Sequence, residues 1–223
     1  MVRHIDSELQ GLKDLALQMG GCVEKSLEQV CYSLSHKNSL VLAQVHNYEK
    51  QINELQIRID EECVNMLAKQ APVARDLRMV IAITRINTDL ERMGDQCVNI
   101  AYSTEDYFEL TKTHPLPADL QQMMSEVQSM VRTVLDAFSR RDVGLSEKVL
   151  EKDDVIDQLK DGLIVQMRDQ IKQDLNSLDW GLNIINVAKN LERLADHATN
   201  IAEEVIYLAT GNDIRHGHTA SNS

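Results

Sequence analysis

The chain has 223 residues, a formal net charge of −12 and 43% hydrophobic residues. This length allows one large domain or two of about 100 residues each, and the hydrophobic content argues against a disordered chain. The acidic balance argues against nucleic acid as a direct partner, because such binding needs a basic surface. With two Phe and one Trp, and with many Leu, Ala, Glu, Lys and Gln residues, the composition favours helices over an all-β fold.

The N-terminal segment soon turns polar, and no apolar run reaches the roughly 18 residues of a membrane-spanning helix. We therefore expect no signal peptide and no direct membrane insertion. The expected location is the cytoplasm, with any contact to the inner face of the membrane made through partners. The four cysteines form no CxxC pair, and we expect buried thiols in a reducing cytosol rather than disulfides or a zinc site: Cys22, Cys31, Cys63 and Cys97.

Helical periodicity runs through the whole chain and predicts an all-α protein with six long helices. Ser7 is the expected N-cap of the first helix. The prolines of segment 113–117 break the pattern in the middle of the chain, and Gly144 marks a short turn. The expected helices span about residues 7–36, 39–70, 72–110, 118–141, 145–174 and 177–208.

The two halves of the chain repeat each other. Residues 90–101 align with residues 191–202, and seven of these 12 positions are identical. Earlier in each half, residues 49–55 align with residues 153–159. A duplicated three-helix unit explains both the long period and the central break. We therefore predict two tandem three-helix bundles, at residues 1–112 and 117–210, followed by a disordered polar tail at 211–223.

Each repeat carries a row of oxygen-bearing side chains at positions i, i+4 and i+8 of its last helix. The first acidic row holds Glu91, Asp95 and Asn99. The second acidic row holds Glu192, Asp196 and Asn200. Side chains at this spacing share one helix face. The apolar residues of the same helices fall on nearly the opposite side, so the rows are expected to be exposed.

A solvated surface is the common explanation of such a row, but three features point to a cation site. Like charges at i, i+4 cost a few tenths of a kcal/mol, so the rows work against helix stability. The spacing occurs twice, and its third member is Asn both times. Hard cations prefer carboxylate and amide oxygens. The preceding helix of each bundle could add Glu49 and Asn53 to the first row and Asp153 and Asp157 to the second.

Other candidate residues have simpler explanations. Gly94 and Ala195 occupy matched positions, where close helix packing accounts for a small residue. Arg78, Arg85 and Arg92 recur every seven residues, and an ion-paired, solvated face is favoured over a phosphate site. His197 lies at the border of the polar face, and a phosphotransfer role is the weaker interpretation.

No pattern indicates an enzyme. A ferritin-like di-iron site needs Glu-x-x-His pairs, which the sequence lacks, and it has no glycine-rich phosphate loop or nucleophile elbow. Two classes of function stay open at this point. One is a regulator that works through protein partners, and the other is a helical protein that stores or buffers iron or manganese.

The doubled Glu-x-x-x-Asp-x-x-x-Asn rows within Leu-Glu-Arg contexts resemble the PhoU family. So do the segment Arg75-Asp76-Leu77-Arg78 and the stretch around Glu49, Ile52 and Asn53. The resemblance covers about residues 5–210. It implies two similar three-helix bundles and multinuclear metal clusters on the rows, iron in some members, with zinc, manganese and magnesium as alternatives. One cluster would use Glu49, Asn53, Glu91, Asp95 and Asn99, and the other Asp153, Asp157, Glu192, Asp196 and Asn200.

The resemblance also implies a function. PhoU proteins are negative regulators of phosphate uptake and of the phosphate-starvation response, and they link a phosphate ABC transporter to a sensor histidine kinase. Homodimers are common in the family. One departure concerns the first cluster, because position 53 is Asn where the family motif often has Asp, and this removes a charge.

Overall fold

The computed structural model describes residues 4–110 and 115–214, and these residues contain helices and no strand. The all-α prediction is therefore confirmed. Two short 3-10 turns precede α2 and α7. The elements are α1 (His4–His36), η1 (Ser39–Val41), α2 (Leu42–Gln70), α3 (Ala74–Leu110), α4 (Ala118–Arg140), α5 (Val143–Leu150), α6 (Asp153–Gln173), η2 (Leu175–Ser177) and α7 (Leu178–Thr210).

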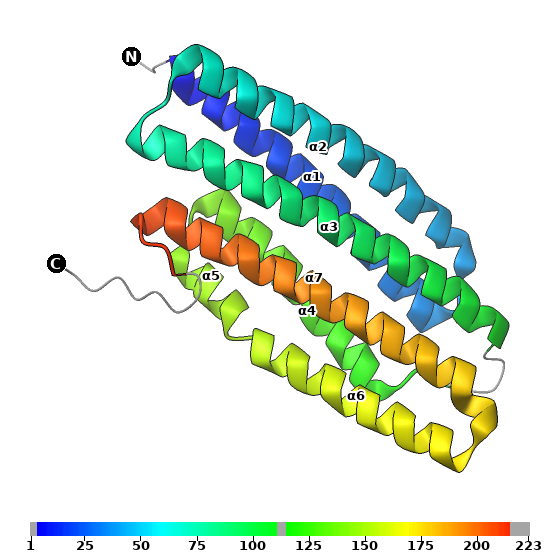
Figure 1. The fold of residues 1–223 in the computed structure, drawn as a ribbon. Coiled ribbons are helices and arrows are strands. Elements are labelled where there is room, and N and C mark those ends of the chain that lie inside the picture. The colour runs from blue at the N-terminus through cyan, green and yellow to red at the C-terminus, as the bar shows by residue number, and fades with distance from the viewer. Residues whose placement is uncertain (1–3, 111–114, 215–223) are drawn as a thin grey trace.

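The helices form two bundles that lie side by side. Helices α1, α2 and α3 form the first bundle, and α4 to α7 form the second (Figure 1). The α2–α3 hairpin and the α6–α7 hairpin point to opposite ends of the molecule (Figure 1). In each bundle, the apolar stripes of the helices meet in the interior, as amphipathic helices require. None of the helices in the described part of the chain is long and apolar enough to cross a membrane.

The predicted apolar faces of α3 and α7 are buried. Ile83, Leu90 and Cys97 of α3 are fully buried, as are Ile184, Leu191 and Ala198 of α7. A Cβ atom on Gly94 would lie 3.0 Å from Ile52 Cδ1 of α2, so the expected close packing is confirmed there. The four cysteines are free and buried, as predicted.

The expected fifth helix is wrong in one respect, because the structure divides it into α5 and α6 at Glu151 and Lys152. Lys152 Nζ donates to Glu126 Oε2 of α4 at 2.7 Å and to Ser129 Oγ at 3.0 Å. No Gly or Pro marks this break, so the periodicity did not reveal it. Gly144 lies inside α5 rather than in a turn, since Asp142 caps the helix by accepting from the Leu145 amide at 3.1 Å.

Two helix starts also differ from the prediction. Ser7 is not an N-cap, because α1 already includes His4. Segment Ser39–Val41 is a 3-10 turn, in which the Asn38 side chain accepts from the Leu40 amide, and α2 begins only at Leu42. Residues 113–114 of the predicted break and residues 215–223 of the predicted tail lie outside the described residues.

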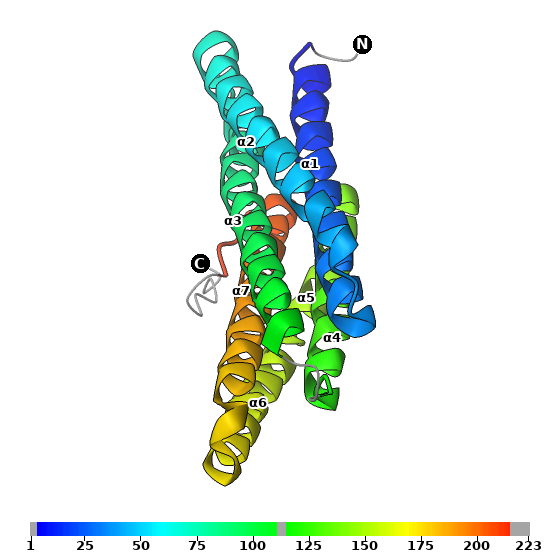
Figure 2. The same ribbon diagram turned by 90° about the vertical axis from the view of Figure 1, so that its right-hand side faces the viewer.

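The most extensive contact between the bundles joins α3 to α7 (Figure 2). Arg85 Nη1 of α3 donates to Glu204 Oε1 of α7 at 2.9 Å and to Oε2 at 3.2 Å. The Glu204 side chain is only 4% exposed. Toward the other end of α3, Ser103 Oγ accepts from Asn186 Nδ2 at 2.7 Å. The contact therefore has an ionic pair at one end and a neutral pair at the other.

These two pairs are related by the internal repeat. Arg85 matches Asn186, and Ser103 matches Glu204, at the same 101-residue offset that relates the acidic rows. The two bundles thus meet through an approximate two-fold arrangement, in which one patch faces its own copy. The positions of the two pairs are equivalent, but their chemistry differs. The Arg85–Glu204 pair is charged, whereas the Ser103–Asn186 pair is an uncharged hydrogen bond.

We predict that Arg85→Ala lowers the free energy of unfolding by about 1–3 kcal/mol, because the buried Glu204 carboxylate loses its guanidinium partner. The double variant Arg85→Asn/Glu204→Ser copies the neutral pair of the other end and should recover most of that loss. Urea unfolding of the single and double variants measures both values. A double variant less stable than Arg85→Ala would contradict the equivalence of the two ends.

Candidate functional site

With the two candidate residues of the preceding helix included, each acidic row has five predicted residues, and four of those in the second acidic row converge between α6 and α7. Asp153 and Asp157 lie in the first turns of α6, and Glu192 and Asp196 lie four residues apart on α7. The Asp157 and Glu192 carboxylates hold the same ammonium group, that of Lys160. The Lys160 Nζ donates to Asp157 Oδ1 at 2.7 Å and to Glu192 Oε1 at 3.0 Å. The predicted convergence of two helices at this row is therefore present in the structure.

The protonation of these carboxyls reflects their crowding. Burial and the neighbouring carboxylates of Glu192, Asp153 and Asp157 raise the pKa of Asp196 to about 6. Burial, followed by Asp157 and other nearby acids, also raises the pKa of Asp153. Hydrogen bonds to Asp157 and Glu192 raise the pKa of the Lys160 ammonium, so it is firmly charged. In the described structure, the second acidic row thus gathers negative charge around the half-buried Lys160 ammonium.

The first acidic row is no more exposed than the second, but it holds no enclosed lysine in the described structure. Glu91 and Asp95 are half-buried on α3, and Asn53 and Asn99 are exposed. Gly94 of α3 and Ile52 of α2 are in close contact, which brings the two helices together at this point. Asp95 and Asn53 are the next residues along these helices. Glu49, one turn earlier on α2, lies 3.6 Å from His46 Nδ1.

The cation beside the first acidic row is loosely held. Arg92 lies 3.6 Å from Glu91 and 3.8 Å from Asp95, and its side chain is 58% exposed. Exposed pairs at such distances contribute little to stability. Burial, followed by the Asp95 carboxylate, raises the pKa of Glu91. Among the described residues, the cation near Glu91 and Asp95 is thus an exposed arginine and not an enclosed lysine.

The asparagines of the two rows do not behave alike. Asn200 lies 3.1 Å from Asp89 Oδ1, which belongs to α3 of the other bundle. It is therefore engaged across the inter-bundle contact, away from its predicted partners on α6. The same Asp89 oxygen lies 2.9 Å from His197 Nδ1. Asn99 shows no such side-chain contact in the described structure, although its carbonyl accepts from Ser103 Oγ.

The fit of a metal to these residues can be judged from their present contacts. Among the residues that the structure describes, no group of three or more His, Cys, Asp or Glu side chains is arranged to hold a metal ion. The second acidic row does not fit a metal as it stands, because an ammonium lies where a cation would bridge Asp157 and Glu192. The first acidic row offers suitable donor types, the carboxylates of Glu91 and Asp95, and side-chain movements would have to bring Glu49 and Asn53 to them.

The sequence patterns missed the role of Lys160, whose position one turn after Asp157 was the available signal. The prediction of a solvated, ion-paired arginine face was correct for only part of the Arg78, Arg85 and Arg92 series. Arg92 is ion-paired on the surface as expected, but Arg85 bridges the two bundles. The guanidinium of Arg78 lies against Gly211 at the end of α7.

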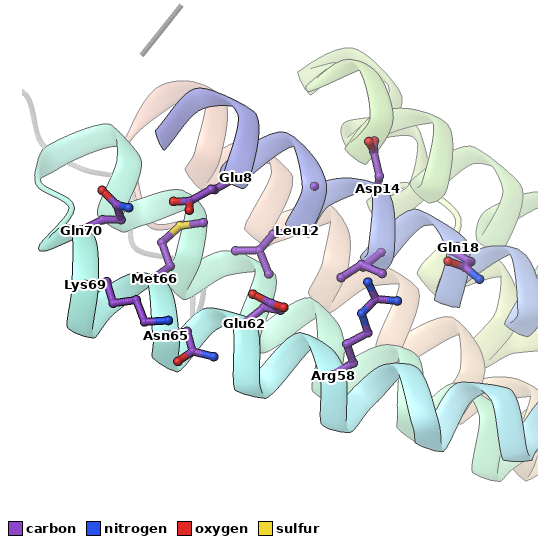
Figure 3. A pocket seen from close by; sticks show the side chains of 12 residues that line it. Glu8, Leu12, Asp14, Gln18, Arg58, Glu62, Asn65, Met66, Lys69 and Gln70 are labelled. Carbon is purple, nitrogen blue, oxygen red and sulfur yellow. The ribbon is translucent and has the colours of Figure 1, made fainter. Parts of the chain in front are cut away.

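A separate pocket of about 380 Å³ opens between α1 and α2. The two helices diverge toward this end of the bundle (Figure 2). Side chains of both charges, such as Glu62 and Arg58, line it together with the apolar Leu12 and Met66 (Figure 3). None of the ten predicted metal-binding residues lies in this pocket.

Known proteins share this sequence along most of its length. The PhoU domain family matches residues 16–104 and again residues 120–205. The chain is 36% identical over 214 residues to the phosphate-specific transport system accessory protein PhoU homolog of Pseudomonas aeruginosa, covering 96% of this chain and 88% of the relative. It is 30% identical over 211 residues to the phosphate-specific transport system accessory protein PhoU of Escherichia coli, covering 95% and 87%.

Solved structures agree with these matches. The crystal structure of PhoU from Pseudomonas aeruginosa superposes with a TM-score of 0.91 at 35% identity, covering 94% of this chain and all of that one. The phosphate transport system regulatory protein PhoU from Streptococcus pneumoniae gives a TM-score of 0.86 at 30% identity, covering 94% and 99%. The match includes both repeats and nearly the whole fold, and this protein therefore belongs to the PhoU family.

Proposed function

We propose that this chain is the accessory protein of a phosphate transport system and a negative regulator of phosphate uptake and of the phosphate-starvation response. The observation that carries the proposal is the match of both repeats to proteins named as accessory or regulatory components of phosphate transport. The family consists of accessory proteins and not of enzymes, so the chain acts through the proteins that it contacts.

Its proposed partners are the cytoplasmic part of a phosphate ABC transporter and a sensor histidine kinase. The two bundles support a bridging role, because they lie on either side of the α3–α7 contact and present separate surfaces (Figure 1). The acidic composition favours basic surfaces on the partners, by charge complementarity. The protein works at the inner face of the membrane through these partners, and it works as a homodimer.

Metal binding is the second part of the proposal. Carboxylate and amide oxygens of Glu49, Asn53, Glu91, Asp95 and Asn99 would take a hard cation such as iron, manganese or magnesium. Burial is the main cause of the raised pKa of Glu91, and a bound cation would offset the added repulsion from Asp95. It would also tie α2 to α3 on a face that is free of core packing. A metal on this face serves structure or partner recognition, since no catalytic group accompanies it.

The regulatory proposal predicts that this chain restores repression of alkaline phosphatase at high phosphate in a bacterium that lacks its own PhoU. The transporter and kinase genes of the chain's own organism should be supplied with it, so that partner divergence does not decide the result. Enzyme output at high and low phosphate is the measurement. Unrepressed output at high phosphate, with the chain soluble and folded beside its own partners, would overturn the proposal.

The metal proposal predicts that Glu91→Gln/Asp95→Asn weakens manganese(II) binding by roughly tenfold or more, because two of the negative ligands are lost. Equilibrium dialysis against MnCl₂ gives the affinity. Glu105→Gln removes an exposed carboxylate of the same helix outside the row and serves as the control. Equal affinities for the control and the double variant would refute a site at the first acidic row.

A further inference from the structure

The second acidic row already contains a cation. The Lys160 ammonium lies between α6 and α7, within hydrogen-bonding distance of one carboxylate on each helix, Asp157 at 2.7 Å and Glu192 at 3.0 Å. Its side chain is only 19% exposed. A lysine so enclosed keeps its charge in place, unlike an exposed lysine that exchanges partners with solvent. It joins the two helices through two carboxylates of the predicted metal-binding set.

The first acidic row has no such group. In the alignment of residues 49–55 with 153–159, continued by one residue, Lys160 corresponds to Gln56, and Asp157 corresponds to Asn53. The two differences belong together. The first repeat has the neutral residues Asn53 and Gln56 at the positions where the second repeat has the ion pair of Asp157 and Lys160. The nearest cation of the first row, Arg92, is largely exposed, and its distances to Glu91 and Asp95 are 3.6 and 3.8 Å.

We propose that Lys160 is the resident cation of the second acidic row and that it excludes metal ions from this row, leaving the first acidic row as the one that depends on an external cation. This inference rests on the metal-binding part of the proposed function. The physical reason is competition for the same oxygens. A metal ion at the second row must displace the ammonium from Asp157 and Glu192, and it then meets a like charge a few ångströms away.

The exchange also explains why the second row, which has more carboxylates, is nevertheless the weaker candidate for metal binding. The second row has four carboxylates, at Asp153, Asp157, Glu192 and Asp196, and the first has three, at Glu49, Glu91 and Asp95. The extra carboxylate, Asp157, is the one that Lys160 neutralises. The number of carboxylates alone would predict stronger metal binding at the second row, whereas the Lys160 contacts predict weaker binding there.

The test is a reciprocal exchange, measured with manganese(II) as the probe. Lys160→Gln gives the second row the residue of the first, and we expect it to bind at least one more equivalent of manganese than the unaltered protein. Its affinity at that row should rise by roughly tenfold or more. Gln56→Lys places an ammonium at the first row and should lower manganese binding there by a similar factor. Equilibrium dialysis and the electron paramagnetic resonance signal of free manganese give the stoichiometry.

A second readout does not depend on metal binding by the unaltered protein. In EDTA, Lys160→Gln should lower the urea midpoint of unfolding, because four carboxylates then repel one another without a cation, and manganese should restore the midpoint. Lys160→Arg keeps the charge and should show neither effect. Lys172→Gln removes a 68% exposed lysine from the same helix and controls for the change in net charge.

The outcomes separate the two proposals. A gain of manganese in Lys160→Gln, with none bound by the unaltered chain, would support the role of Lys160 and refute a metal at the first row. The inference is overturned if Lys160→Gln binds no more manganese than Lys172→Gln, or if Asp196→Asn removes manganese that the unaltered protein binds. The second result would mean that metal displaces the ammonium.

Discussion

The packing of α3 against α7 is the constraint on which the rest of the molecule depends. Each of these helices must bury one side in its own bundle and another side against its counterpart, so only a narrow face of each stays free. The acidic rows occupy those faces. Their position next to the inter-bundle contact follows from this geometry, and it explains why Asn200 and His197 meet Asp89 of the other bundle rather than residues of their own.

Polar groups at this contact fix how the bundles meet. Apolar stripes alone tolerate sliding and rotation, whereas the Arg85–Glu204 pair and the Ser103–Asn186 pair each require one register. The Glu204 carboxylate is nearly inaccessible to water, and an unpaired charge there would be costly. Two such points, one toward each end of the contact, hold the bundles in a defined orientation.

Much of the architecture followed from periodicity and repetition. The buried faces of α3 and α7 and the close packing at Gly94 were predictable from the sequence. The convergence of α6 with α7 was an expectation that spacing alone could not establish, and the shared Lys160 ammonium shows it. The break at Glu151 and Lys152 was not predictable, because a tertiary contact to Glu126 and Ser129 of α4, and no helix-breaking residue, accompanies it. Lys160 was missed for a related reason: a lysine on a charged helix looks solvated until the neighbouring helix is placed. Whether the rows hold metal stays a prediction, since residue types define suitable donors but not their occupancy.

The approximate two-fold arrangement has a consequence for how the two halves can differ. In a dimer of identical chains, a substitution appears at both symmetric positions at once, so a lysine placed in one row would enter the other as well. A duplicated unit within one chain is free of that restriction. The ionic and neutral ends of the contact, and the lysine at position 160 where the first repeat has Gln56, are differences of this kind. The two repeats of one chain can therefore diverge, so that one acidic row is neutralised by its own lysine while the other lacks that lysine.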